Sequence, residues 1–201
     1  MSQAELFADE PRVLVEDAEG GIRYRPGFVD PATADAWFVA LRDGVRWRRE
    51  RRPMYDRVVD VPRMLAGYAL DAPDLPAPLR DAARRVEAAL QAPFTHVGMN
   101  YYRDGDDSVA MHNDKLYSIV PGWPIALVSL GAARRMDIRA KPGEGGTGRR
   151  PPLRLLLEPG SLLVMSHASQ LHWEHGIPKT RDPVGPRISL AFRVRPEGGR
   201  W

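Results

Sequence analysis

The segment Arg187-Ile-Ser-Leu-Ala-Phe-Arg193 decides the fold class of this chain. Apolar residues occupy its even positions, and this period of two predicts a β-strand with one apolar face. The opposite face carries two arginines that bracket two small residues, one of which is Ser189. Because guanidinium groups pair with carboxylates, Arg187 and Arg193 would suit a small dicarboxylate ligand held between them. The alternative is an exposed strand whose arginines are solvated.

Similar short runs recur throughout the second half of the chain. From about Phe94 onward they return at intervals of roughly ten residues, namely 95–102, 125–130, 136–140, 153–157, 161–166 and 187–195. Turn sequences such as Arg103-Asp-Gly105 and Glu158-Pro-Gly160 separate them. Regular short strands with Gly and Pro turns predict a β-sandwich or barrel rather than a parallel βαβ sheet.

The first half of the chain has a different pattern. Residues 1–20 look like a loosely held arm, and 21–25 alternate like a short strand. Helical spacing of apolar residues predicts helices over 31–44 and about 78–91. The stretch 46–57 is rich in arginine, and prolines at 62, 73, 76 and 78 indicate a loop region after it. We therefore predict one β-rich α+β domain over 1–201, with a helical N-terminal part (1–94) and a β core (95–197).

Composition excludes several classes of protein and of site. The 201 residues are 43% hydrophobic and 27% charged, which is ordinary for a folded domain and argues against disorder. The absence of cysteine excludes disulfides, zinc–thiolate sites and iron–sulfur clusters, so a metal would need His, carboxylate or carbonyl ligands. The sequence contains no run of about 18 uncharged apolar residues, so it predicts no membrane span. The first residues lack the pattern of a signal peptide, so we expect a cytoplasmic protein.

Positive charge is clustered in two segments. The net charge is +3, yet residues 46–57 hold six arginines against two acidic residues, and residues 134–154 hold seven basic residues against two acidic ones. Such clusters favour binding to a polyanion such as a nucleic acid. The alternative is a compositional bias, since almost all the cations are arginine and the chain is also rich in Ala and Pro.

His112-Asn-Asp114 has the spacing of a pair of metal ligands. In an extended segment the side chains of His112 and Asp114 point to the same face. A third ligand from a distant strand would complete a set of two histidines and one carboxylate, which suits non-haem iron. Three histidines are candidates for that role: His167, His172 and His175. The alternative is a surface pair or a helix cap.

The order of these motifs resembles the AlkB family of iron(II)- and 2-oxoglutarate-dependent dioxygenases. The supporting motifs are Asn100-Tyr-Tyr-Arg-Asp-Gly105, Met111-His-Asn-Asp114, Pro124-Ile-Ala-Leu-Val-Ser-Leu-Gly131, Pro159-Gly-Ser-Leu-Leu-Val-Met165, His172-Trp-Glu-His-Gly-Ile-Pro178 and the segment 187–193. The resemblance covers about residues 95–195 and implies a double-stranded β-helix, or jelly roll, preceded by helices and a substrate lid.

The resemblance also implies a ligand set. His112, Asp114 and His175 would be the iron ligands and the catalytic centre. The residues that would bind 2-oxoglutarate are Asn100, Tyr102, Arg187, Ser189 and Arg193. Arg187 would pair with the distal carboxylate, and Arg193 would lie near the carboxylate that chelates iron. Ser189 stands where several relatives have Asn, which would weaken one contact to 2-oxoglutarate.

By this resemblance the chain would remove alkyl groups oxidatively from bases in nucleic acid, DNA repair being the expected role. It would consume 2-oxoglutarate and O2 and release succinate, CO2 and an aldehyde. The candidate substrate-binding residues of the lid are Arg48, Arg49, Arg51, Arg52, Met54, Tyr55, Arg63 and Tyr68. We expect a monomer. Lys115, Leu116 and Tyr117 follow Asp114 where many relatives carry acidic residues, so the resemblance does not fix a base preference.

Three alternatives remain open at this stage. The chain could be a 2-oxoglutarate oxygenase that acts on RNA or on a protein. It could also be a non-catalytic jelly-roll binding module, against which the intact set of His112, Asp114, His175, Arg187 and Arg193 argues. A structural protein without any ligand would leave the charges on the strand 187–193 unexplained.

Overall fold

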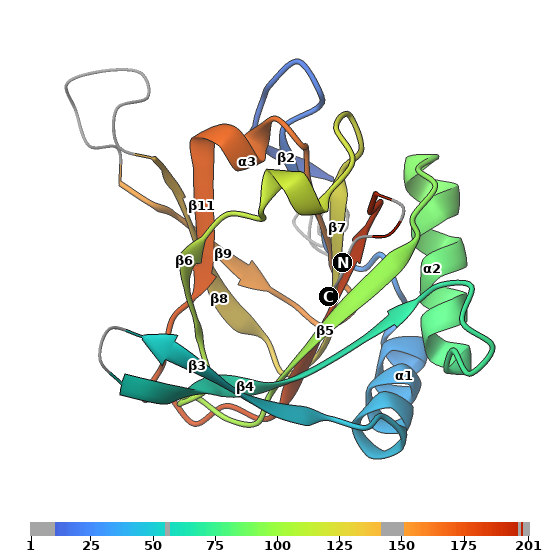
Figure 1. Ribbon diagram of the computed structural model, residues 1–201, viewed down its shortest axis with the longest axis vertical. Coiled ribbons are helices and arrows are strands. Elements are labelled where there is room, and N and C mark those ends of the chain that lie inside the picture. Colours follow the sequence, from blue (N-terminus) through green and yellow to red (C-terminus); the bar gives the residue numbers. More distant parts are fainter. Residues whose placement is uncertain (1–10, 55–56, 142–150, 197, 199–201) are drawn as a thin grey trace, which may run out of the picture.

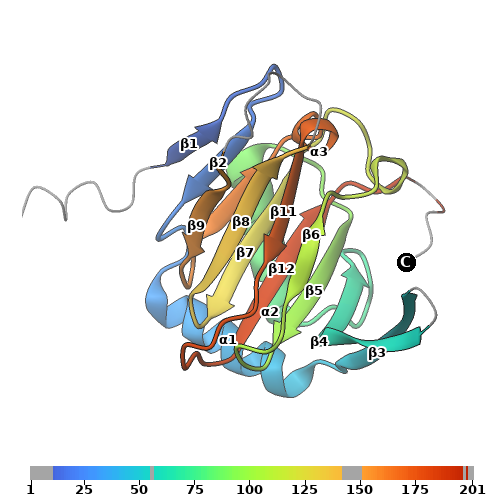
Figure 2. The ribbon, with the colours of Figure 1, turned by 90° about the vertical axis from the view of Figure 1, so that its left-hand side faces the viewer.

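Two antiparallel sheets face each other in the molecule (Figures 1 and 2). The computed structural model describes residues 11–54, 57–141, 151–196 and 198, except the side chains of residues 52–59. The large sheet has eight strands in the order β1-β2-β10-β7-β12-β5-β4-β3, and the small sheet has four in the order β6-β11-β8-β9. This arrangement confirms the predicted jelly-roll core. Within the described residues, no helix is long and apolar enough to span a membrane.

The strands of the large sheet are β1 (Arg12–Val15), β2 (Ile22–Arg25), β3 (Arg48–Met54), β4 (Arg57–Ala69), β5 (His96–Tyr102), β7 (Ile125–Gly131), β10 (Leu162–Met165) and β12 (Arg187–Arg193). The small sheet contains β6 (Val109–His112), β8 (Arg134–Ala140), β9 (Leu153–Leu157) and β11 (Trp173–Ile177). Helices α1 (Pro31–Gly44) and α2 (Ala77–Leu90) precede the core, and two short turns, η1 (Leu116–Ser118) and α3 (Ser169–His172), connect its strands.

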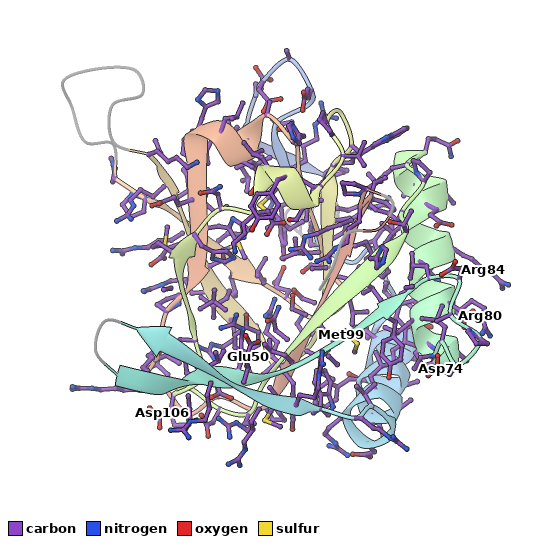
Figure 3. The ribbon with its side chains drawn as sticks, viewed as in Figure 1. Glu50, Asp74, Arg80, Arg84, Met99 and Asp106 are labelled. Atoms are coloured by element: carbon purple, nitrogen blue, oxygen red, sulfur yellow. The ribbon has the colours of Figure 1, made fainter. Side chains whose placement is uncertain are left out.

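Helices α1 and α2 form where the sequence predicts them. The Asp30 carboxylate accepts a hydrogen bond from the Thr33 N–H at 2.9 Å, and Pro31 occupies the first turn of α1. Both helices pack their apolar sides against one face of the large sheet, which we call the outer face. Figure 3 shows Arg80 and Arg84 projecting from α2 away from the sheet.

The strand β12 separates two apolar clusters. Its even residues lie on the outer face, where Ile188, Leu190 and Phe192 join the cluster under α1 and α2. Its odd residues lie on the inner face, which we define as the face turned toward the small sheet; Ala191 there joins the cluster between the sheets. The predicted alternation is therefore confirmed, and it places both arginines of the segment on the inner face.

The segment 46–69 departs from the prediction. The proline-marked loop at Pro62 is wrong, since Pro62 lies inside β4, which forms a hairpin with β3. The register of the hairpin shifts between Arg49, opposite Met64, and Arg51, opposite Asp60. Pro62 falls in that bulge, where no ladder hydrogen bond from its nitrogen is required. Residues 12–15, expected as part of an arm, form the edge strand β1.

Candidate metal and carboxylate site

Two histidines face each other across neighbouring strands of the small sheet. His112 ends β6 and lies directly opposite His175 on β11, with ring centroids 4.5 Å apart. Burial, and then the proximity of His112, lowers the pKa of His175 to about 3. The His175 imidazole is therefore neutral and keeps a lone pair, as a metal ligand requires.

Asp114 lies just beyond the end of β6, next to the end of β12. Its carboxylate accepts two hydrogen bonds from Arg193, from Nε to Oδ2 at 2.7 Å and from Nη2 to Oδ1 at 3.1 Å. Burial alone would raise the pKa of Asp114, but Arg193 and the nearby histidines lower it below its usual value. The carboxylate is thus ionised and held in a fixed direction.

The backbone of Asp114 is held separately, by the side chain of Gln170. Its N–H donates to Gln170 Oε1 at 2.9 Å. In the described part of the chain, no three His, Asp or Glu side chains are close enough to hold an ion as they stand. The structure brings the two histidines together, whereas the Asp114 carboxylate is bonded to Arg193.

Arg187 is the largest fully buried side chain of the described residues, with no exposed surface. Its Nη2 donates to Ser129 Oγ at 2.9 Å, but Nε and Nη1 have no hydrogen-bond acceptor. Among the described residues, no carboxylate forms an ion pair with it. Burial lowers the pKa of Arg187 from its ordinary value, although an arginine stays charged in proteins. A buried cation with two unpaired donors is costly, and an incoming carboxylate would satisfy both.

The ring of Tyr102, on the inner face of β5, lies beside two guanidinium groups. The Arg187 guanidinium carbon is 5.1 Å from the ring centroid, and that of Arg134 is 5.7 Å away. Arg134, by contrast, donates three hydrogen bonds, to the carbonyls of Asp104, Asp107 and Pro178. Nothing in the sequence indicated this buried role of Arg134, which belongs to the basic segment 134–154.

The two remaining predicted 2-oxoglutarate residues also lie on this inner face. Ser189 pairs with Ser129 of β7, and both are buried. Asn100 accepts a hydrogen bond from Arg63 Nε at 2.7 Å. Arg63 was predicted to bind substrate from the lid, but its guanidinium instead holds Asn100. This contact adds a third arginine near Tyr102.

The predicted lid residues separate into three groups. Arg48, Arg49 and Arg51 are exposed on β3, and Arg51 makes an exposed ion pair with Asp60 at 3.3 Å. Arg52 and Met54 lie on β3 but their side chains are outside the described residues, as is Tyr55 altogether. The prediction for Tyr68 is wrong, because its ring packs on the outer face against the cluster under the helices.

The hairpin of β3 and β4 carries the predicted lid residues, and we call it the lid hairpin. It has an aromatic anchor at its base. The Trp47 ring lies 5.2 Å from that of Tyr101, and its Nε1 donates to the Arg42 carbonyl at the end of α1. In Figures 1 and 2 the hairpin and η1 project on the same side of the molecule, on either side of the strands that carry the candidate site. Glu50, labelled in Figure 3, lies on β3 between Arg49 and Arg51 in the sequence.

The second basic segment, 134–154, does not form one basic surface over its described residues. Arg134 is buried, and on the other face of β8 the side chain of Arg139 pairs with Glu174 at 2.7 Å. Arg135 pairs with Asp137 on the same strand at 3.1 Å. The two other candidate histidines, His167 and His172, precede and end α3 and do not lie opposite His112.

The residues present fit an iron(II) centre with a dicarboxylate co-substrate. Two imidazoles and one carboxylate are the donor set that non-haem iron prefers, and they leave open positions. The two unpaired nitrogens of Arg187 on the inner face suit one carboxylate of such a co-substrate.

Comparison with known proteins gives three findings. The family model of the 2OG-Fe(II) oxygenase superfamily matches residues 67–193. The chain is 40% identical over 102 residues to the human DNA oxidative demethylase ALKBH2, a match that spans 50% of this chain and only 39% of that protein. It is 30% identical over 223 residues to the human alpha-ketoglutarate-dependent dioxygenase alkB homolog 3, over 96% of this chain and 77% of that protein.

A solved structure, that of OsALKBH1, superimposes on 92% of this chain and on all of its own chain, with a TM-score of 0.62 and 15% identity. At that identity the likeness concerns the fold alone. It agrees with the two-sheet arrangement described above.

Proposed function

Since the chain belongs to the 2OG-Fe(II) oxygenase superfamily, and within it to the AlkB family, we propose that it removes alkyl groups oxidatively from bases in nucleic acid. Its co-reactants are those of the superfamily: iron(II), 2-oxoglutarate and O2. The observation that carries the proposal is the fully buried guanidinium of Arg187, whose Nε and Nη1 have no acceptor among the described residues. It lies on the inner face of the large sheet, which is turned toward the small sheet that carries His112 and His175.

Each residue has one task in this proposal. His112, Asp114 and His175 would hold iron. Arg187 would bind the distal carboxylate of 2-oxoglutarate, with Tyr102 and Asn100 beside it, and Arg193 would lie near the other carboxylate. The remaining inner-face contacts position these groups: Ser129 orients Arg187, and Arg63 orients Asn100.

Bound iron and 2-oxoglutarate would supply the oxidant that hydroxylates the alkyl carbon, with 2-oxoglutarate converted to succinate and CO2. The hydroxylated N-alkyl group then leaves as an aldehyde, and the base regains its N–H. No side chain has to act as a general base in this scheme. The apolar cluster between the sheets keeps bulk water away from the buried side of the site.

The nucleic acid is proposed from two lines of support. ALKBH2 acts on DNA according to its name, and the exposed arginines of β3 form a basic ribbon beside the site. A stacked base in a duplex cannot reach a buried metal, so the substrate base has to be flipped out or taken from a single strand. Arg48, Arg49 and Arg51 would then contact phosphates rather than the base.

The test is formaldehyde release from a panel of N-methylated substrates: single-stranded DNA, duplex DNA, RNA and peptide. We expect release from nucleic acid and dependence on iron and 2-oxoglutarate. Release from the peptide alone would favour a protein oxygenase. If neither formaldehyde nor succinate forms with any substrate, a non-catalytic binding module is the better interpretation.

Binding of an oligonucleotide at several salt concentrations tests the basic ribbon. Replacing Arg48, Arg49 and Arg51 by alanine should reduce the slope of log affinity against log salt by about 0.7–0.9 for each phosphate that the variant no longer neutralises. The control replaces Arg23, Arg84 and Arg154, three exposed arginines on β2, α2 and β9. An equal change in both variants would refute the assignment to β3.

A further inference from the structure

Gln170 holds the backbone of Asp114, whose carboxylate is held by Arg193. Asp114 lies beyond the last β6 residue that pairs with β11, so the sheet does not fix its backbone. The side chain of Gln170 is buried, and its Oε1 accepts a hydrogen bond from the Asp114 N–H, 56 residues away in sequence. Asp114 is therefore fixed at two points, its backbone by Gln170 and its carboxylate by Arg193.

Gln170 is itself held in place by its neighbours. Its Nε2 donates to Ser169 Oγ at 3.2 Å and lies 3.9 Å from Met165 Sδ. The backbone carbonyl of Gln170 accepts a hydrogen bond from Lys141 Nζ at 2.7 Å. These contacts fix the orientation of the Gln170 side-chain amide. Its Nε2 points at the Ser169 hydroxyl oxygen, and its Oε1 therefore points at the Asp114 N–H.

The turn between β1 and β2 fixes the short helix that carries Gln170. Ser169 N–H donates to Ser166 Oγ at 2.9 Å, and Ser166 Oγ donates to Asp17 Oδ2 at 2.5 Å. The Ala168 N–H donates to Glu19 Oε2 at 2.7 Å. A chain of hydrogen bonds thus runs from Asp17 through Ser166 and Ser169 to Gln170 and ends at Asp114.

We propose that Gln170 is a positioning residue for the metal site, which sets the direction of the Asp114 carboxylate relative to His112 and His175. This inference rests on the proposed function, since it assumes that Asp114 is a ligand. Residues that orient a ligand affect metal affinity, typically by 10- to 100-fold when they are replaced. The β1–β2 turn contributes to the same affinity from a distance by fixing α3.

The test compares metal affinity among variants of the full chain, with cobalt(II) and iron(II) titrated calorimetrically in the absence of oxygen. Gln170→Met keeps the length of the side chain and removes the acceptor, and it should weaken metal binding by about 10- to 100-fold. Gln170→Glu keeps an oxygen toward Asp114 and should retain most of the affinity. Ser118→Ala removes a hydrogen bond to the Lys115 carbonyl in the same loop and should leave affinity unchanged.

Hydrogen exchange of the Asp114 amide supplies a second readout. It should be slow in the wild type and faster in Gln170→Met. Wild-type metal affinity in a variant whose Asp114 amide exchanges freely would overturn the inference. If Gln170→Met does not fold, Gln170→Asn shortens the side chain by one methylene and should show the same weakening; a folded Gln170→Asn with wild-type affinity overturns it equally.

Failure of this inference differs from failure of the proposed function. A wild-type chain that binds metal and releases formaldehyde, together with a Gln170→Met variant of equal metal affinity, refutes only the role of Gln170. The variant His112→Ala is expected to bind no metal. If the wild-type chain binds no metal either, the iron site is refuted, and the positioning role of Gln170 with it. Asp17→Ala should decrease metal affinity less than Gln170→Met does, because Asp17 acts on Asp114 only through Ser166, Ser169 and Gln170. A larger decrease would contradict this order of hydrogen bonds.

Discussion

Two buried arginines, Arg187 on β12 of the large sheet and Arg134 on β8 of the small sheet, should respond differently to the same substitution. Arg187 has two guanidinium nitrogens without an acceptor, whereas Arg134 donates to three backbone carbonyls. Both lie beside the ring of Tyr102 and both are buried. Replacing each by methionine removes a buried positive charge and leaves an apolar chain in its place.

The sizes of the two effects follow from these contacts. Each buried donor without a partner costs about 1–3 kcal/mol, so Arg187 costs the ligand-free protein roughly 2–6 kcal/mol. Its hydrogen bond to Ser129 and its contact with Tyr102 offset roughly 3–4 kcal/mol of that cost. Arg187→Met should therefore change the free energy of unfolding by about −2 to +3 kcal/mol. Arg134→Met leaves three carbonyls unpaired and should destabilise the protein by about 3–5 kcal/mol.

The assay is thermal unfolding of the wild type and both variants, with and without 2-oxoglutarate and a divalent metal. A ligand at about 100 times its Kd stabilises a protein by about 2.7 kcal/mol, or about 5–10 °C for a chain of this length. With metal present, addition of 2-oxoglutarate should give the wild type this shift and give Arg187→Met none, although the two proteins are about equally stable without ligand. If Arg187→Met unfolds as early as Arg134→Met and still responds to 2-oxoglutarate, the reasoning about unpaired donors is refuted.

Three further predictions concern stability and the lid. Gly131→Ala should destabilise the protein by about 2–4 kcal/mol in urea, because Gly131 has φ +78° and a Cβ would lie 2.5 Å from the Pro186 carbonyl oxygen. Burial would raise the pKa of Asp107, but hydrogen bonds from Arg103 lower it, so its stabilising contribution is present above its unfolded pKa and is lost on acidification through its lower folded pKa. Between about pH 5 and pH 2 the free energy of unfolding, measured in urea, should therefore fall less for Asp107→Asn than for the wild type. Trp47→Ala should weaken oligonucleotide binding in an anisotropy assay and leave metal affinity unchanged, because it detaches the base of the lid hairpin.

The sequence predicts those elements whose residues face a uniform environment. The segment 187–193 alternates because one face packs under the helices and the other faces the small sheet, and both environments select residue types strongly. Helix α1 is bounded by Asp30 and Gly44, which are local signals. The pairing of His112 with His175 was expected only through the resemblance, since spacing alone left three histidines open.

Predictions failed where one signal had two structural meanings. Pro62 marks a break in a local pattern, but a bulge in a hairpin accommodates proline as well as a loop does. Tyr68 lies in a strand that has an inner and an outer face, and without the register the sequence cannot assign one. The basic segment 134–154 looked uniform because a charge count does not distinguish Arg134, buried against carbonyls, from Arg139, paired with Glu174.

The contacts that set the properties of the site are non-local and therefore absent from any local pattern. Arg63 and Asn100 are 37 residues apart, and Gln170 and Asp114 are 56 apart. Through such contacts the two sheets gather three arginines around Tyr102, and no carboxylate of the described residues pairs with Arg187. A protein selected for stability alone would replace that cation by an apolar residue. Its retention is explained if the missing carboxylate arrives with the co-substrate, so that ligand binding supplies the free energy that the fold lacks at this point.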